Sequence, residues 1–304
     1  MSRHFVTVSE TSHEDLDEIL AGALRPVPTT ELEGIRVSLV FERPSLRTRA
    51  SSIASVQDLG GQVAVFTDAE IGIDTRESAE DIARTLAETS SIVAARVKNH
   101  DVFARMQLAT GDRVSYINLL SNYAHPAQAV ADTLTLAEVF GGSLGELAGR
   151  TVTYVGDATN VTRSLATILV GFGVNVRVAA PEGYDLSTAD VALIESRARY
   201  GGSLSVGDDA AALVRGADAV YTDSWISMGL EDEAAERRHV FAPYQVNADL
   251  MSHAPDAFIL HCLPAHRGEE ITDEVLDSPR SLIWREVHHR TTAMYGILRW
   301  IKGA

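Results

Sequence analysis

Short apolar runs alternate with amphipathic stretches along most of the chain. A short run of consecutive apolar residues is typical of a buried strand, and apolar residues spaced three or four positions apart are typical of a helix. In the first half this pattern predicts strands at residues 37–41, 63–66, 92–97 and 114–119. It predicts helices at residues 48–59, 78–88, 102–109 and 126–140, after an N-terminal helix that begins at the capping-box sequence Thr11-Ser12-His13-Glu14.

The second half repeats the alternation after a glycine-rich stretch at residues 141–149. The predicted strands are residues 151–155, 174–179, 219–222 and 258–263, and the predicted helices are residues 161–170, 188–199, 210–214 and 287–301. Strands that alternate with helices indicate an α/β fold whose parallel sheets are covered by helices on both faces. We therefore expect two doubly wound parallel-sheet domains, with a boundary in the glycine-rich stretch.

The composition narrows the classes of partner. The 304 residues carry a formal net charge of −16, which argues against nucleic acid or an anionic membrane as a partner. Cys262 is the only cysteine, so an internal disulfide is impossible and a reducing, cytoplasmic setting is expected. The sequence begins without an apolar secretory segment and contains no apolar stretch of membrane-spanning length, so we expect a soluble protein.

Polar clusters follow the predicted strands. In parallel α/β sheets, ligands bind beyond the carboxyl ends of the strands. Six clusters occupy such positions: residues 45–49, Arg96, His125 with Gln128, residues 157–160, Asp223, and residues 261–267. Their shared placement predicts a ligand site along these strand ends.

The sequence Ser45-Leu46-Arg47-Thr48-Arg49 lies at a strand-to-helix turn. The first turn of a helix offers backbone N–H groups and the positive end of the helix dipole. Two hydroxyls and two guanidinium groups add further donors, and this combination suits a small dianion such as phosphate. The alternative is a capped helix start whose arginines are solvated.

Arg96, His125 and Gln128 also allow structural roles. A buried Arg96 needs an anion, which is either a ligand or an acidic residue of the helix at residues 78–88. In the sequence His125-Pro126-Ala127-Gln128, His125 and Gln128 either face a ligand from the helix start or form a polar cap. The helix dipole favours a neutral His125 that can donate to a carbonyl oxygen.

Three residues of the second half allow similar pairs of interpretations. Asn160 either holds a carboxylate or caps a helix. Asp223 either pairs with an amine or stabilises a turn. Cys262 is either a nucleophile or a buried, unreactive thiol.

The sequence gives little indication of a nucleotide-binding or metal-binding site. Residues 156–160 lack the G-x-G-x-x-G spacing of dinucleotide-binding loops. The spacing of His261, His266 and the pair His288-His289 is not that of metal ligands on one helix face. We therefore expect no metal.

Taken together and in this order, the motifs resemble those of the aspartate/ornithine carbamoyltransferase family, most closely its ornithine branch. Residues 45–49 are similar to the family's carbamoyl phosphate signature Ser-Thr-Arg-Thr-Arg, and residues 125–128 to its His-Pro-x-Gln motif. The segments similar to ornithine-branch motifs are Asp223 with Ser227-Met228-Gly229, Tyr244-Gln245-Val246-Asn247, and His261-Cys262-Leu263-Pro264. The resemblance covers nearly the whole chain.

The resemblance implies a carbamoyl phosphate-binding domain at residues 1–143, completed by a C-terminal helix at residues 287–304. It implies an amino-acid-binding domain at residues 144–286, with the active site in the cleft between the domains. A carbamoyl group would pass from carbamoyl phosphate to a small-molecule amine without a metal or an organic cofactor. The implied assembly is a homotrimer or a multiple of trimers.

The resemblance also assigns roles at the carbamoyl phosphate site. Thr48, Arg96 and His125 would stabilise the negative charge that develops on the carbonyl oxygen. Gln128 and the backbone carbonyls of Cys262 and Leu263 would hold the carbamoyl NH₂ group. The full set of implied carbamoyl phosphate ligands is Ser45, Leu46, Arg47, Thr48, Arg96, His125, Gln128, Cys262, Leu263 and Arg290.

For an amino-acid acceptor, the resemblance implies that Asn160, Ser227 and Met228 fix the α-carboxylate and the α-amine. Asp223 would bind an amine, and Cys262 would line the pocket without acting as a nucleophile. The implied catalytic residues are therefore Arg96, His125, Thr48, Asp223 and Cys262.

Several residues depart from the family pattern. Leu46 and Asn122 replace a threonine and an aspartate, Thr159 and Arg163 replace asparagines, and His288-His289 stand where Glu-Asn is usual. The loss of a negative charge at Asn122 would alter how a cationic acceptor is held. The added positive charge of Arg163 would disfavour a free cationic diamine and favour an anionic or carboxylated acceptor.

Four functions remain open at this stage. Transfer to L-ornithine, giving L-citrulline and phosphate for arginine biosynthesis, is the expected reaction. The alternative within the class is another amine, such as a modified ornithine, a shorter diamino acid or a specialised-metabolite amine. Two other classes are a nucleotide-dependent enzyme that uses residues 156–160 and a catalytically inactive binding subunit.

Overall fold

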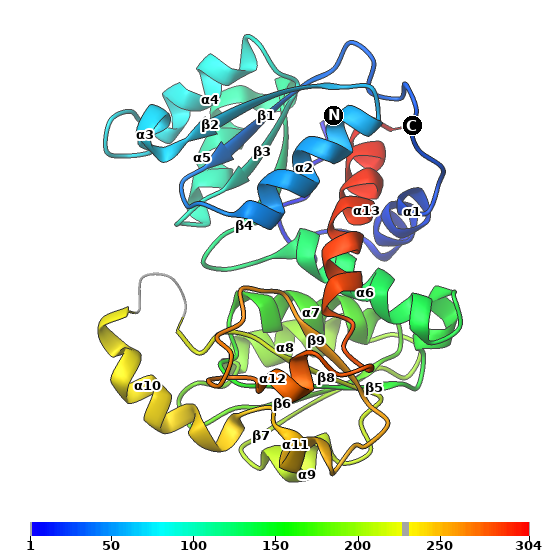
Figure 1. Cartoon of the computed structure of the whole chain (residues 1–304). Coiled ribbons are helices and arrows are strands. Elements are labelled where there is room, and N and C mark those ends of the chain that lie inside the picture. Colours follow the sequence, from blue (N-terminus) through cyan, green and yellow to red (C-terminus); the bar gives the residue numbers. More distant parts are fainter. Residues whose placement is uncertain (1, 227–230, 304) are drawn as a thin grey trace. The chain divides into compact units, whose positions relative to one another are not determined.

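The computed structural model describes residues 2–226 and 231–303, and it confirms the α/β class with parallel sheets. The chain divides into two compact units. Unit 1 comprises Met1–Ala131 and His288–Ala304, and unit 2 comprises Asp132–Val287. The chain leaves unit 1 within helix α6 (Pro126–Val139) and returns to it within helix α13 (Ile283–Lys302) (Figure 1).

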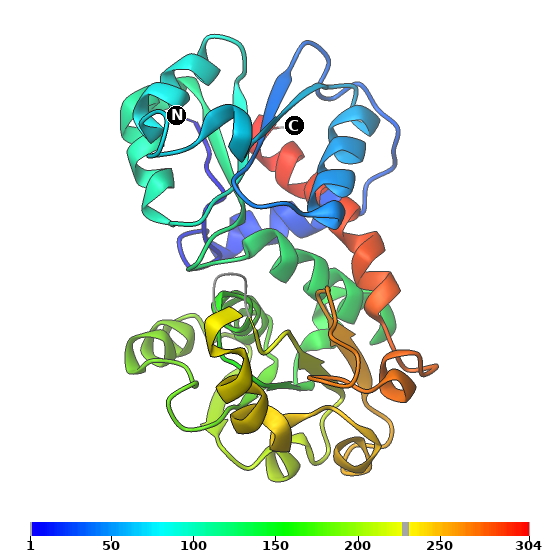
Figure 2. The same cartoon turned by 60° about the vertical axis from the view of Figure 1, so that its left-hand side comes forward.

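Unit 1 is built on a parallel sheet. In spatial order its strands are β2 (Gln62–Thr67), β1 (Arg36–Phe41), β3 (Ile92–Arg96) and β4 (Ser115–Leu120). Helices α4 (Ala79–Ala87) and α5 (Asp101–Thr110) cover one face and share a buried apolar cluster with the strands. Helix α2 (Leu46–Asp58) and the last part of α13 lie on the other side of the sheet (Figure 1 and Figure 2).

Helix α13 packs closely on helix α1 (His13–Ala23) at a glycine. A Cβ atom added to Gly296 would lie 2.0 Å from the carbonyl oxygen of Ile19. One turn later, the buried Arg299 donates to the carbonyl oxygens of Gly22 at 2.6 Å and Pro26 at 2.9 Å. Since the last carbonyl groups of a helix lack intrahelical donors, Arg299 satisfies the end of α1 and fixes α13 against it.

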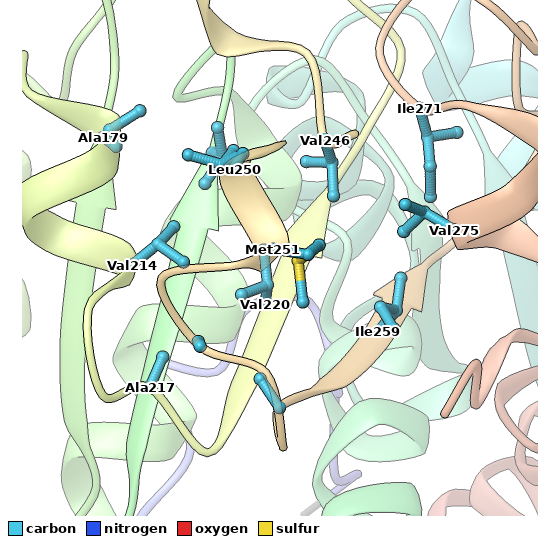
Figure 3. Close-up of a cluster of buried hydrophobic side chains, with 14 of the residues drawn as sticks. Ala179, Val214, Ala217, Val220, Val246, Leu250, Met251, Ile259, Ile271 and Val275 are labelled. Carbon is cyan, nitrogen blue, oxygen red and sulfur yellow. The ribbon is translucent and has the colours of Figure 1, made fainter. Parts of the chain in front are cut away.

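Unit 2 contains the second parallel sheet. In spatial order its strands are β7 (Ser203–Gly207), β6 (Asn175–Ala179), β5 (Thr151–Val155), β8 (Ala219–Thr222) and β9 (Phe258–His261). Helices α9 (Ala210–Val214), α11 (Ala248–Met251) and α12 (Asp273–Leu276) share one apolar cluster with these strands. In Figure 3, Met251 and Val275 extend toward Val220 and Ile259 of the strands.

The other face of this sheet carries helices α7 (Asn160–Gly171) and α8 (Thr188–Ser196) (Figure 1). The remaining short elements are α3 (Asp68–Ile71), α10 (Ala234–Phe241) and the 3₁₀ turns Gly111–Arg113, Leu144–Leu147, Glu231–Glu233 and Ala242–Tyr244. None of the helices in the described part of the chain has the length and hydrophobicity that a membrane span requires.

Several predicted elements differ from the structure, among them the last helix, which begins at Ile283, four residues before its predicted start. Strand β7 was not predicted, because it is a sheet-edge strand whose residues are mostly exposed. The first helix is capped by Ser12, whose Oγ accepts the N–H of Asp15 at 3.1 Å, so the cap lies one residue later than predicted. Helix α2 begins at Leu46, two residues before the predicted start.

The close packing at Gly296 can be tested by replacing this glycine with alanine, which adds one methyl group. We expect Gly296→Ala to destabilise the protein by about 1–3 kcal/mol, because the new methyl group would overpack against the backbone of α1. Thermal unfolding should show a lower Tm by about 3 °C per kcal/mol. The control is Gly145→Ala, since a Cβ at Gly145 would lie 3.9 Å from its nearest described neighbour. Equal Tm values for the two variants would contradict the close packing.

Candidate active site

The first half-site begins at the N-terminus of α2 in unit 1. Ser45 is the N-cap residue, and its Oγ accepts the N–H of Thr48 at 3.4 Å. The Leu46 side chain is 81% exposed, so this position can serve a ligand through its backbone rather than through the missing threonine hydroxyl. A capped first turn presents N–H groups and the positive end of the helix dipole to an anion.

Arg290 of α13 joins this turn to α6. Its Nη2 donates to Thr48 Oγ1 at 2.6 Å, and its Nη1 donates to Gln128 Oε1. All three side chains are buried. The structure therefore brings together three predicted ligands that are far apart in the sequence.

His125 lies buried among positive charges. Burial lowers its pKa well below the ordinary 6.5, and the charges of Arg290, Arg96 and Arg47 lower the pKa further. The imidazole is therefore neutral at neutral pH. The three arginines come from α13, the end of β3 and α2, so separate elements concentrate positive charge around one ring. This charge favours a bound dianion.

The structural alternative for Arg96 was an ion pair with an acidic residue at positions 78–88. The three acidic residues of that segment have other cationic partners. The pairs are Glu80 with Arg105 at 2.7 Å, Asp81 with Arg84 at 2.7 Å, and Glu88 with Arg113 at 3.0 Å. These contacts argue against an ion pair between Arg96 and that segment.

The second half-site lies in unit 2, where β8 and β9 end. Asp223 Oδ1 accepts the N–H of Ser224 at 2.8 Å and the thiol of Cys262 at 3.2 Å. Burial raises the pKa of Asp223 and raises the pKa of Cys262 well above its usual range, and the nearby Asp223 charge adds to the shift at Cys262. Cys262 is therefore a protonated thiol at neutral pH, which argues against a thiolate nucleophile.

The predicted acceptor residues are only partly visible. Asn160 is the first residue of α7, after the N-cap Thr159, and its Oδ1 accepts the N–H of Val161 at 3.0 Å. Ser227, Met228 and Gly229 lie outside the described residues.

Arg163 and Asn122, which differ in charge from the family pattern, both have local hydrogen-bond partners. Arg163 donates to Asp190 at 2.6 and 2.9 Å, and this ion pair offsets the positive charge that would disfavour a cationic acceptor. Asn122 Oδ1 accepts the N–H of His100 at 2.9 Å, so Asn122 stabilises a loop. Arg163 and Asn122 are therefore compatible with a cationic acceptor.

Arg237 of α10 was not predicted from the sequence. Its buried Nη1 donates to Asp157 Oδ2 at 2.6 Å and to the carbonyl oxygen of Trp225 at 2.8 Å. It thereby joins the loop after β5 to the loop after β8, which carries Asp223. The sequence feature that could have pointed to Arg237 is Glu233, which lies four residues earlier and forms an ion pair with it at 3.0 Å.

Family models match nearly the whole chain. The model described as aspartate/ornithine carbamoyltransferase, carbamoyl-P binding domain, matches residues 3–138, and the Asp/Orn binding domain of the same family matches residues 148–301. The chain belongs to the aspartate/ornithine carbamoyltransferase family. The resemblance inferred from the motifs is confirmed.

Individual members of the aspartate/ornithine carbamoyltransferase family are similar to this chain over nearly their whole length. The chain is 40% identical to an ornithine carbamoyltransferase of Bradyrhizobium diazoefficiens, over 98% of this chain and 96% of that protein. The structure of ornithine carbamoyltransferase from Pyrococcus furiosus has a TM-score of 0.93 and 36% identity, over 100% of this chain and 98% of that chain. An acetylornithine transcarbamylase complexed with acetylcitrulline has a TM-score of 0.84 and 26% identity, over 97% and 98% of the two chains.

The charge around His125 can be measured by NMR titration of the protein's 10 histidines. We expect the pKa of His125 to lie well below 6.5 in the free protein. Saturating inorganic phosphate should raise it, because a bound dianion favours the protonated ring. His125→Asn assigns the resonance. A pKa near 6.5, or no response to phosphate, would contradict a dianion site beside this ring.

Proposed function

We propose that the protein transfers the carbamoyl group of carbamoyl phosphate to the side-chain amine of L-ornithine and releases L-citrulline and phosphate. The observation that carries the proposal is the cluster of Arg47, Arg96 and Arg290 around the neutral His125. A dianion and a polarised carbonyl group are the two features of carbamoyl phosphate that such a cluster suits. Membership of the carbamoyltransferase family supports the reaction class.

The phosphate group is assigned to the first turn of α2. Ser45, the Leu46 backbone, Arg47 and Thr48 bind its oxygens, with Arg290 beside them. Gln128 and the backbone carbonyls of Cys262 and Leu263 bind the carbamoyl NH₂ group. Arg96, His125 and Thr48 face the carbonyl oxygen.

The reaction forms one bond and breaks another. The lone pair of the neutral amine attacks the carbonyl carbon, and negative charge develops on the carbonyl oxygen. His125 donates a hydrogen bond to this oxygen as a neutral ring, while Arg96 supplies a positive charge. As the carbon–oxygen bond to phosphate breaks, its electron pair leaves with phosphate, and the attacking nitrogen transfers a proton to the departing phosphate. Positioning of the two substrates supplies much of the rate, and the proposal requires no metal or organic cofactor.

The acceptor is assigned to unit 2. Asp223 binds an amine of the amino acid, and its two described hydrogen bonds come from neutral donors. Asn160, Ser227 and Met228 bind the α-carboxylate and α-amine, although the last two lie outside the described residues. Cys262 contributes a neutral thiol to the pocket. A modified ornithine is the second candidate, favoured by the structural likeness to an acetylornithine transcarbamylase.

The proposal extends to the domains, the oligomeric state and the biological role of the protein. Residues 1–143 with 287–304 form the carbamoyl phosphate-binding domain, and residues 144–286 form the amino-acid-binding domain. We further propose a cytoplasmic homotrimer that serves arginine biosynthesis. An anabolic ornithine carbamoyltransferase of Pyrococcus furiosus, 41% identical over 91% of this chain, supports the biosynthetic role.

A panel of amines tests the function. With carbamoyl phosphate, we expect L-ornithine to give citrulline with the largest kcat/KM among L-ornithine, N-acetylornithine and shorter diamino acids. Arg96→Ala should lower kcat by about 10²–10³-fold, as expected for the loss of an oxyanion donor. Arg113→Ala is the matched control, since Arg113 is exposed and pairs with Glu88.

The outcomes separate the alternatives. Carbamoylation of another amine without citrulline formation would overturn the acceptor. Absence of phosphate release with every amine would overturn the transferase assignment. Near-normal turnover by Arg96→Ala would remove Arg96 from the site.

A further inference from the structure

The ring of His261 is fully buried at the end of β9, and both ring nitrogens have hydrogen-bond partners. Nδ1 lies 2.9 Å from the backbone nitrogen of Leu263, and Nε2 lies 3.0 Å from Glu270 Oε1. Because a backbone N–H only donates, Nδ1 must be the acceptor and carries no proton. The ring proton therefore lies on Nε2 and is donated to Glu270, which fixes one tautomer.

Buried carboxylates hold His261 from two sides. Glu270 Oε1 also accepts the backbone N–H of His266 at 2.6 Å, which closes the loop that begins at His261. Glu286 Oε2 accepts the backbone N–H of His261 at 2.9 Å. Both carboxylate side chains are buried. The position of the ring and the direction of its Nδ1 are thus set by long-range contacts within unit 2.

The bond to Leu263 holds a peptide group beside an unusual backbone conformation. Leu263 has a φ of +59°, in the left-handed region that residues other than glycine rarely adopt. The N–H of Leu263 is directed at the ring two residues earlier, so this bond fixes the orientation of the Cys262–Leu263 peptide group, directly before the left-handed residue. The turn sets the orientation of the Cys262 and Leu263 peptide groups. It also bears on the Cys262 thiol, which donates to Asp223 at 3.2 Å.

We propose that His261 is a positioning residue for carbamoyl transfer: its Nδ1 holds the Cys262–Leu263 turn, and Glu270 selects the tautomer that makes Nδ1 an acceptor. This inference rests on the proposed function, because the carbonyls of the turn are assigned there to the carbamoyl NH₂ group. The His261 ring is fully buried and both of its nitrogens have partners within unit 2, so its role is indirect. Its effect reaches the reaction through the backbone of Cys262 and Leu263.

Two substitutions at His261 each keep one of the ring's two hydrogen bonds and remove the other. An asparagine places its amide oxygen near the position of Nδ1, so His261→Asn keeps an acceptor for the Leu263 N–H and loses the contact with Glu270. A glutamine places its amide nitrogen near the position of Nε2, so His261→Gln keeps the donor to Glu270 and loses the acceptor. Each variant is therefore the control for the other.

Steady-state kinetics and thermal unfolding should rank the variants in opposite orders. We expect His261→Asn to keep kcat within about threefold of the wild type, and His261→Gln to lose on the order of 10²-fold because the turn is misplaced. His261→Asn should nevertheless have the lower Tm, since it deprives the buried Glu270 of its ring donor. Activity that simply follows Tm, or two variants as active as the wild type, would overturn the positioning role.

The tautomer provides a test that needs no folded variant. In the wild-type protein, long-range ¹H–¹⁵N NMR should show a protonated Nε2 and an unprotonated Nδ1 for His261. A proton on Nδ1 would overturn the proposal directly. Wild-type turnover in the amine panel separates this inference from the function. Inactivity with every amine rejects the function, whereas an active wild type with equally active variants rejects only the role of His261.

Discussion

Positive charge held around one buried imidazole is the constraint on which the candidate active site depends. Arg47, Arg96 and Arg290 all act on the pKa of His125, and each belongs to a different element of unit 1. The cluster can form only when α2, β3 and α13 are folded together. Burying like charges is costly, and a bound dianion offsets that cost. The arginines proposed to bind phosphate therefore also help to keep His125 neutral, in addition to the larger effect of burial.

The half-site in unit 2 concentrates negative charge, whereas the half-site in unit 1 concentrates positive charge. Three carboxylates lie near the ends of β5, β8 and β9, and the two buried ones have nitrogen-bearing partners: Asp157 with Arg237, and Glu270 with His261. Asp223 differs, because its described hydrogen bonds come from a backbone N–H and a neutral thiol. An ammonium group is the partner that would most stabilise its ionised form. A dianionic donor in unit 1 and a cationic amino acid in unit 2 fit these two environments.

The sequence predicted the buried parts of this structure better than the exposed ones. The central strands were predicted because they are continuous apolar runs, whereas β7 was missed because its residues are exposed at a sheet edge. The strand-end rule correctly singled out residues 45–49 and His125 as parts of one region of unit 1. Partners distant in the chain were beyond local patterns. Arg290 meets Thr48 across 242 positions and Arg237 meets Asp157 across 80, and only the family resemblance pointed to Arg290.

Calorimetric titration with inorganic phosphate tests the central claim most directly. The wild-type protein, Arg47→Ala and the exposed control Arg113→Ala should be compared at one pH and ionic strength, after circular dichroism has shown that all three are folded. We expect phosphate to bind the wild type and the control with equal affinity. Arg47→Ala should bind it about 10–100-fold more weakly, since a charged hydrogen bond contributes about 1.5–3 kcal/mol. Unchanged phosphate affinity in a folded Arg47→Ala variant would contradict an anion site at the first turn of α2.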